Sequence, residues 1–294
     1  MPDQNLKDQI QYAYKRMKHG RIKGFLLCWV IYVFMGGIVS LFLGNPFPHK
    51  ESVFFFFSIW DSGWIYTWAD TRPYLLVIFT AAGMVLSSIG LSVMILRDLA
   101  KIDQVILQQC DAAIYLEAME YGVAYGKSLK CKGFQTSVFM MMQQRLATAL
   151  IANGKLEESR QFLTEEWIGK KSSRLYKKIV MNLDLVEAYY HGDAGKFNEL
   201  FQNADFAFKK NKLFAAEQMF LEEKYEQAAA FLKTYKAKNP YNEVLRQYLL
   251  GMCFDKTGEK QMAEDCMQYV LARGNTMPCR KRAQEWILTN VPKV

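Results

Sequence analysis

The residues that could do catalytic or metal chemistry are few and widely separated along this chain. Six cysteines and three histidines are present, but no CxxC pair occurs and no histidine lies at zinc-ligand spacing from a cysteine. No GxSxG, GxxxxGK[ST] or HExxH sequence is found. Neighbouring carboxylates such as Glu157 and Glu158 point about 100° apart on a helix, so they do not converge on a substrate. We therefore expect no enzymatic activity, no cofactor and no metal ion.

The cysteines themselves are better explained by packing than by chemistry. They are Cys28, Cys110, Cys131, Cys253, Cys266 and Cys279. Free cysteine behaves as a small buried hydrophobe in a reducing compartment, and a disulfide framework is not expected in a cytosolic domain. We expect these side chains to be reduced and buried.

The charge of the chain narrows the classes of partner. The formal net charge is +8, and a mildly basic domain fits attraction to an anionic lipid bilayer. No stripe of Lys and Arg is interleaved with aromatic residues, so we expect no nucleic acid as partner. No small-molecule substrate is evident either.

Two long stretches without a charged side chain dominate the first hundred residues, at 24–43 and 74–96. About 20 apolar residues, at about 1.5 Å of rise each, span a bilayer core of about 30 Å. We predict a transmembrane helix at each stretch. A signal peptide competes for the first, but no small-residue cleavage site follows it. A buried helix of a globular domain is the alternative for either.

The flanking charges predict the orientation of this hairpin. Residues 1–23 carry six Lys and Arg, and Arg97 and Lys101 follow the second stretch. The positive-inside rule then places both termini in the cytoplasm, in a cell-membrane protein with two spans. The loop at 44–73 would lie outside, with an aromatic segment at 53–69 in the outer interface. Alternatively, 53–69 is a third span, which would move the C-terminal domain outside.

Downstream of the second stretch the pattern is helical throughout. A helical connector is expected at 97–129, followed by a domain at 130–294 in which four short segments recur. These are GKLEES at 154–159, GKFNEL at 195–200, EKYEQA at 223–228 and GEKQMA at 258–263. Their starts are 41, 28 and 35 residues apart. Each segment is preceded by a helical stretch and followed by an apolar run.

This pattern resembles the tetratricopeptide repeat, a helix–turn–helix unit of about 34 residues. The best match is 244–276, where Gly251 and Ala263 fall at the small positions and Gly258 at the turn. The unit 209–242 also matches. The uneven intervals depart from the family, as do Ser159 and Leu200 at positions where alanine is usual. The resemblance implies an all-α fold with an α-solenoid of helix pairs after the two-helix transmembrane hairpin; the alternative is an irregular helical bundle.

The resemblance also implies a binding surface, because the first helix of each pair lines a concave groove in that family. The residues placed there are Thr148, Glu187, Tyr190, His191, Lys210, Glu217, Phe220, Tyr248, Met252, Asp255 and Lys256. Their mixed charges favour no ligand class. A last helix from about Pro278 is expected to cover the end of the stack, with Arg280, Lys281 and Arg282 facing solvent.

Three functions follow from these features. The leading hypothesis is a non-enzymatic, membrane-tethered protein-interaction module that presents its groove to an unidentified cytoplasmic protein or peptide. The second is a membrane signalling or regulatory receptor in which the outer aromatic loop is the sensor. The third is a membrane enzyme whose site lies at the interface.

Overall fold

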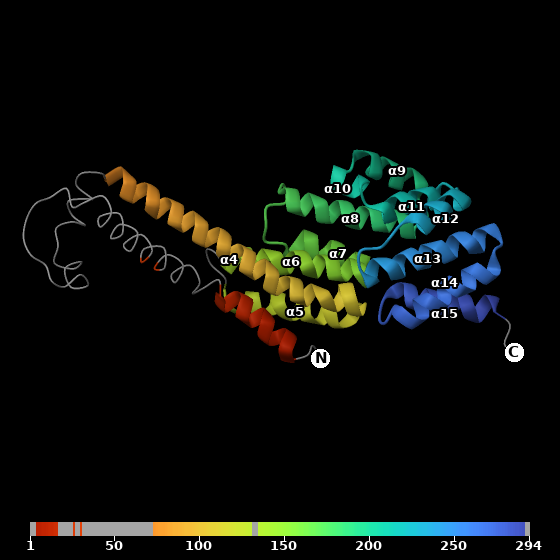
Figure 1. The fold of residues 1–294 in the computed structure, drawn as a ribbon, viewed down its shortest axis with the longest axis horizontal. Helices are drawn as coiled ribbons and strands as arrows, with labels where there is room; N and C mark the ends of the chain where they lie inside the picture. The colour runs from red at the N-terminus through yellow and green to blue at the C-terminus, as the bar shows by residue number, and fades with distance from the viewer. Residues whose placement is uncertain (1–3, 17–25, 27–29, 31–72, 131–134, 292–294) are drawn as a thin grey trace, which may run out of the picture. The chain divides into compact units, whose positions relative to one another are not determined.

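The computed structural model describes residues 4–16, 26, 30, 73–130 and 135–291. Within these ranges the chain forms helices and connecting turns and no strand (Figure 1), which agrees with the all-α class. In chain order the helices are 4–16, α4 (Pro73–Gln109), α5 (Ala112–Ser128), α6 (Gln135–Ala152), α7 (Leu156–Gln161), the π-helical turn η1 (Phe162–Glu166), α8 (Arg174–Tyr190), α9 (Ala194–Asn203), α10 (Phe206–Lys209), α11 (Lys212–Leu221), α12 (Tyr225–Thr234), α13 (Pro240–Thr257), α14 (Lys260–Arg273) and α15 (Pro278–Asn290). The chain divides into two compact units, one of 1–12 with 99–294 and one of 13–98.

The predicted two-helix transmembrane hairpin is contradicted, and with it the cell-membrane localisation with two spans. No helix of the described part of the chain is both long and apolar enough to cross a membrane. The stretch 74–96 does not end as a separate span but is the first part of α4, which has 37 residues and continues past Arg97 and Asp98. The first predicted span and the loop at 53–69 lie outside the described residues, apart from Leu26 and Val30.

Packing accounts for one face of the later part of α4. Leu91, Ile95, Leu99 and Ile102 are buried, and their spacing of three and four residues forms one stripe along the helix. The absence of charge at 74–96 was the basis for predicting a membrane span. Burial accounts for only part of this apolar character, because Leu86, Ile89 and Val93 are exposed. In the unit 13–98, Ala13 and Tyr14 are also buried.

Four tight turns repeat through the larger unit, and each has one residue in the left-handed conformation. These turn residues are Gly154, Gly192, Glu223 and Gly258, with φ of +72°, +67°, +60° and +84°. In each turn the next residue donates its backbone N–H to the carbonyl five residues earlier, at 2.9 Å in all four cases, as in Lys155 to Leu150 and Glu259 to Phe254. This is the Schellman arrangement that ends a helix. The same helix–turn–helix junction is therefore built four times.

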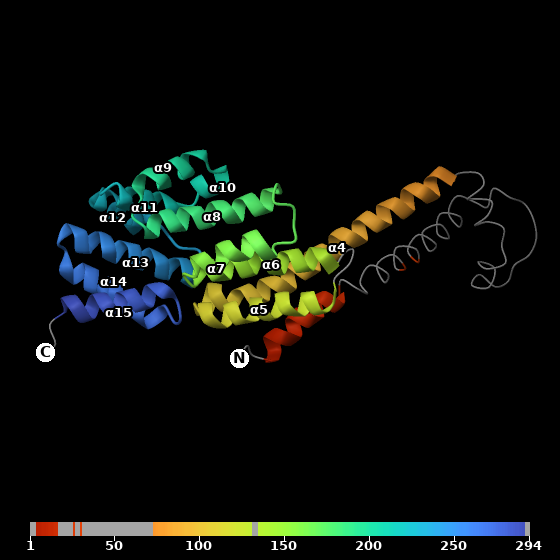
Figure 2. The same cartoon turned by 180° about the vertical axis from the view of Figure 1, so that it is seen from behind.

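The turn residues give a more regular spacing than the sequence motifs. Their intervals are 38, 31 and 35 residues, because the second turn is at Gly192, three positions before Gly195. The first helices of the pairs are α6, α8, α11 and α13, and the second helices are α7 with η1, α9, α12 and α14 (Figures 1 and 2). The register predicted for the second unit is thus three residues late.

Within each pair, two positions keep a fixed distance from the turn residue and hold the helices together. Seven residues before the turn residue lie Ala147, Leu185, Ala216 and Gly251, and five residues after it lie Ser159, Phe197, Ala228 and Ala263; all are buried. Ser159 donates from Oγ to the carbonyl of Ala147 at 3.3 Å. A Cβ on Gly251 would lie 3.4 Å from the carbonyl of Ala263 and 3.0 Å from Cys266. Close helix approach therefore requires small residues in three pairs, while the second pair uses Leu185 and Phe197.

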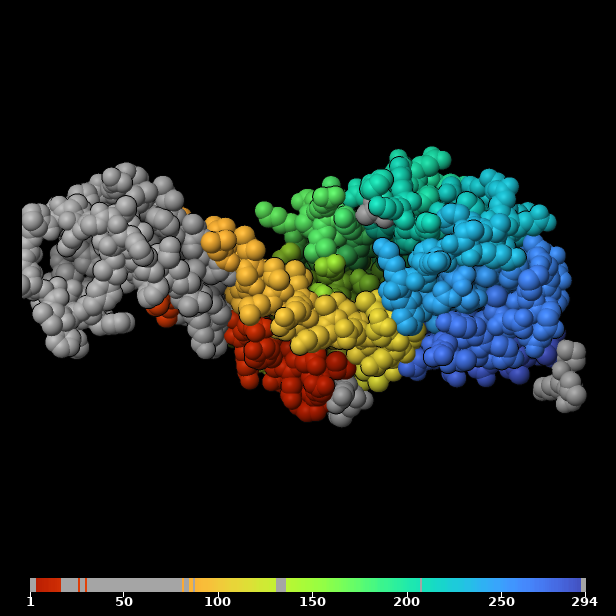
Figure 3. Space-filling model, viewed as in Figure 1, coloured from red at the N-terminus to blue at the C-terminus, as the bar shows by residue number. Residues whose placement is uncertain are grey.

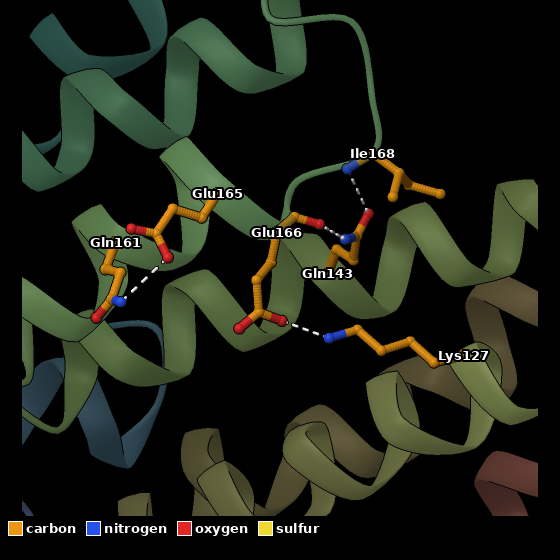
Figure 4. Close-up of polar contacts among 6 residues, drawn as sticks. All are labelled: Lys127, Gln143, Gln161, Glu165, Glu166 and Ile168. Carbon is orange, nitrogen blue, oxygen red and sulfur yellow. Dashed lines mark hydrogen bonds and ion pairs between the residues drawn. The ribbon is translucent and has the colours of Figure 1, made fainter.

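The junction between the first and second pairs is fixed by a buried glutamine. The Nε2 of Gln143 on α6 donates to the carbonyl of Glu166 at 2.8 Å, and its Oε1 accepts from the backbone N–H of Ile168 at 3.5 Å (Figure 4). Lys127 of α5 forms an ion pair with the Glu166 side chain. Because η1 ends here without further helix, Gln143 satisfies backbone groups that would otherwise be buried without partners. This contact sets the direction in which the chain leaves for α8.

Candidate functional site

A cavity of about 270 Å³ lies on the side of the stack formed by the first helices. Its walls come from α6, α8, α11 and α13, and residues 277–282 at the start of α15 provide the remaining wall. Figure 3 shows the part of the domain that supplies these walls, from the green of α6 and α8 to the cyan and blue of α11 and α13. The cavity is slightly smaller than the 300–1,000 Å³ typical of ligand pockets. This volume accommodates one side chain or a small molecule.

The position of α15 converts the groove between first helices into this cavity. Thr276 donates from Oγ1 to Oδ1 of Asp111 at 2.8 Å, and Asn275 donates from Nδ2 to the other carboxylate oxygen at 3.3 Å. Asn153, beside the first turn residue, donates to the carbonyl of Ala112 at 2.8 Å. Cys110 and Cys279 belong to one buried cluster. The start and the end of the repeat array are thus bonded to each other.

Glu217 supplies the one carboxylate of the cavity wall. It lies on α11, and its Oε2 atom is buried with no hydrogen-bond partner. No ion pair involves Glu217 in the described part of the chain. Burial raises the pKa of Glu217 to about 8, because a carboxylate in an apolar site is poorly solvated. At pH 7 the Glu217 side chain is therefore mostly a neutral carboxylic acid.

Four tyrosines from two helices line the cavity together with this acid. Tyr189 and Tyr190 come from α8, and Tyr241 and Tyr248 come from α13. Burial raises the pKa of each of these hydroxyls, and the nearby Glu217 carboxylate adds to the rise at Tyr189, Tyr190 and Tyr241. The cavity is therefore an aromatic box with neutral hydroxyls around one acid.

Arg282 of α15 lies at the rim of the same cavity. Its guanidinium carbon is 4.2 Å from the centre of the Tyr190 ring, a cation–π contact. Its charge also opposes the burial effect on the pKa of Tyr190 and Tyr248. The residue is solvent-exposed overall and has no carboxylate partner in the described residues. The expectation that Arg282 belongs to a purely solvated face overlooked this contact.

Of the residues predicted to form the groove, four line the cavity: Thr148, Tyr190, Glu217 and Tyr248. Thr148 and Glu217 each lie six residues before their turn residue, so repeat geometry alone places them together. The sequence reasoning did not single out Tyr189, Tyr241 or Arg282. The spacing of Tyr241 and Tyr248, two turns apart on one face of α13, could have identified that side of the helix.

The other predicted residues have structural surroundings outside the cavity. Glu187 is buried and bound to Arg160, with 2.5 Å between Oε2 and Nη2. Phe220 packs on Tyr225 with ring centres 5.2 Å apart, and Asp255 pairs with Lys260 at 2.5 Å. His191 and Lys256 are exposed, Lys210 lies 5.7 Å from the Phe206 ring, and Met252 packs on the α13–α15 core.

A second hollow, of about 830 Å³, lies between 108–110, the chain before α13 and the end of α14. Its carboxylate, Glu243, is already bound to Arg246 with 2.6 Å between Oε1 and Nη2. No buried polar atom without a partner lines it among the described residues. No group of three or more His, Cys, Asp or Glu in those residues could hold a metal ion. The cavity around Glu217 is therefore the candidate site.

Comparison with protein families, with curated proteins and with solved structures finds no match to this chain. The resemblance to the tetratricopeptide repeat thus stays a prediction. What the structure adds is the fourfold repetition of one helix–turn–helix junction.

Proposed function

We propose that residues 112–290 form a protein-interaction domain that takes one side chain of a partner polypeptide into the cavity. The observation that carries this proposal is that α15 closes the groove while every first helix still contributes to its wall. A bound helix is about 10–12 Å in diameter, which 270 Å³ does not accommodate. A single long side chain is the part of a polypeptide that fits.

The lining supports recognition of a protein segment rather than catalysis. The walls combine aromatic rings and apolar side chains such as Val186 and Leu245 with polar side chains such as Asn182 and Asn242. Aromatic residues and arginine are the types enriched where proteins bind each other. Tyr190 is more than a third exposed, and together with Arg282 at the rim it could contact the backbone that carries the inserted side chain.

A displayed peptide library provides the test, with the full chain as bait. Thr148 is exposed, lines the cavity and donates to the carbonyl of Gln144 at 3.0 Å. In Thr148→Trp the indole should block the cavity without a buried clash, and selected peptides should bind at least tenfold more weakly. Thr289→Trp is the matched control, because Thr289 is also exposed and also bonds the carbonyl four residues earlier, outside the cavity. Peptides that bind wild type and Thr148→Trp equally would refute the proposal.

A further inference from the structure

The carboxyl group of Glu217 is the feature of the cavity that no part of the fold accounts for. A buried polar atom without a hydrogen bond costs stability, and Oε2 of Glu217 is such an atom. In the part of the chain that the structure describes, the other buried side-chain atoms of this kind are Gln9 Oε1 and the indole nitrogens of Trp167 and Trp286, and none of them lines the cavity. Glu217 is half-buried and lines the cavity, and its Oε2 has no hydrogen-bond partner among the described residues.

The surroundings of Glu217 are suited to a positive charge. Aromatic faces attract ammonium and guanidinium groups, most strongly where water is excluded. Tyr190 already holds one cation, the Arg282 guanidinium, at 4.2 Å from its ring centre. No Lys or Arg side chain pairs with Glu217 from within the described residues. The site thus combines aromatic side chains with a carboxyl group, that of Glu217, which forms no ion pair within the described residues.

We infer that the cavity binds an organic cation, an alkylammonium or guanidinium group, with Glu217 as its counter-ion and the α8 and α13 tyrosines as its walls. This inference rests on the proposed function and names its ligand: the inserted side chain is lysine or arginine. The cation enters the box, and the backbone carbonyls of the same segment lie near Arg282 at the rim. A free amine offers the same chemistry and is separated from a peptide by the experiment below.

Binding of the cation requires that Glu217 lose its proton. The carboxylic acid releases one proton to solvent, and the carboxylate then pairs with the ammonium, so charge is conserved. Because the pKa of Glu217 in the empty site is about 8, affinity should fall about tenfold for each pH unit below 8 and level off above it. The ammonium of lysine keeps its charge over this range, since its pKa is about 10.4.

No other group near Glu217 should produce this pH dependence. The titratable groups around it are Tyr189 and Tyr190 of α8, Tyr241 and Tyr248 of α13, and Cys279 of α15, and burial raises the pKa of all five. Arg282 keeps its charge throughout. The remaining elements packed on α11 are α9, α10 and α12; their charged side chains Lys196, Glu199, Lys209, Glu226 and Lys233 are exposed and outside the cavity, as is His191.

Calorimetric titration of the full chain tests the inference with defined probes. The probes are N-acetyl-lysine amide, n-butylammonium, and N-acetyl-norleucine amide as the uncharged analogue. At pH 9 the lysine amide should bind at least tenfold more tightly than the norleucine amide. At pH 7, titrations in buffers of different ionisation enthalpy should show release of close to one proton per bound cation.

Two variants separate the role of Glu217 from a general loss of fold. Glu217→Gln keeps the shape of the side chain, and it should abolish both the preference for the cation and the proton release. Arg282→Gln removes the competing cation at the rim, and it should tighten binding of n-butylammonium several-fold. The inference would be overturned by an Arg282→Gln variant that binds n-butylammonium no more tightly than wild type does. It would also be overturned by a Glu217→Gln variant that binds n-butylammonium as tightly as wild type does.

The outcomes also distinguish this inference from the proposed function. If no cation binds better than the norleucine amide, while library peptides remain sensitive to Thr148→Trp, the inference fails and the proposed function stands. If cations bind in a Glu217-dependent manner but no peptide does, the inference stands and the proposed function fails. If n-butylammonium binds and the lysine amide does not, the cation is a free amine, which again supports the inference but not the proposed function.

Discussion

The hydroxyl of Thr276 donates a hydrogen bond to Oδ1 of Asp111 at 2.8 Å, across 165 positions of sequence. The same oxygen accepts the backbone N–H of Ile114 at 3.0 Å and so caps the start of α5. The second carboxylate oxygen accepts from Asn275. One side chain therefore caps α5, which precedes the first pair, and binds the segment before α15. This link keeps α15 across the first helices and closes the cavity.

Asp111→Ala should therefore destabilise the domain by more than the loss of an ordinary helix cap does. We expect a loss of about 2–3 kcal/mol in urea unfolding, because the cap contributes about 1 kcal/mol and the bonds to Asn275 and Thr276 are lost with it. Asp193→Ala is the control, since Asp193 caps α9 through the N–H of Lys196 at 2.9 Å and is exposed. A cost no larger than that of Asp193→Ala would show that the closure contributes nothing.

Glu223→Gly should stabilise the domain by about 1 kcal/mol. Glu223 has φ of +60° at the turn position where the other three units have glycine, and a side chain in the left-handed region costs about 1–2 kcal/mol. Glu223 is exposed, so no packing is lost. The control is Ala230→Gly at an exposed site inside α12, where glycine should destabilise by about 1 kcal/mol. Chemical denaturation of both variants measures the difference, and a destabilised Glu223→Gly would contradict the turn geometry.

The repeated unit could be predicted from the sequence because it depends on residues that lie close together along the chain. Small residues such as Ala216, Gly251 and Ala263 at fixed distances from a turn are visible in one sequence, and they are the buried contacts of the structure. The second unit was misaligned because Gly195 resembled the turn glycine and Gly192 did not stand out. Backbone conformation, not residue type, distinguishes these two glycines.

The cavity and the α4 packing could not be predicted in the same way. The cavity exists because 275–279 returns to Asp111 and Ala113, and such a contact between distant segments leaves no local pattern. Arg282 looked like a solvated residue because its neighbours Arg280 and Lys281 carry charge too. For α4, an uncharged stretch is typical of a membrane span and of a buried helix alike; the structure buries Leu91 and Ile95 but leaves Leu86, Ile89 and Val93 exposed.

The four described cysteines should be unreactive in the native protein. Cys110, Cys253, Cys266 and Cys279 are buried and free. Burial raises the pKa of Cys253 and Cys279 to about 12 and that of Cys266 to about 11, and the thiolate is the reactive form. In a Cys28→Ser, Cys131→Ser background, a thiol reagent at pH 8 should modify no cysteine before unfolding and four after it. Rapid modification of the native protein would contradict this burial.

Glu217→Gln should remove a pH dependence of stability from the folded protein. The pKa of Glu217 is about 8 when folded and near 4.5 when unfolded, so the folded chain binds the extra proton between these values. By linkage, wild-type stability then falls as pH rises through this window, by at most about 1.4 kcal/mol per unit. Glutamine has no charge to bury. In urea unfolding, the free energy of unfolding of the variant, relative to that of wild type, should therefore increase from pH 6 to pH 9. Glu226→Gln, at an exposed site, is the control; an equal change in both variants would place the titration elsewhere.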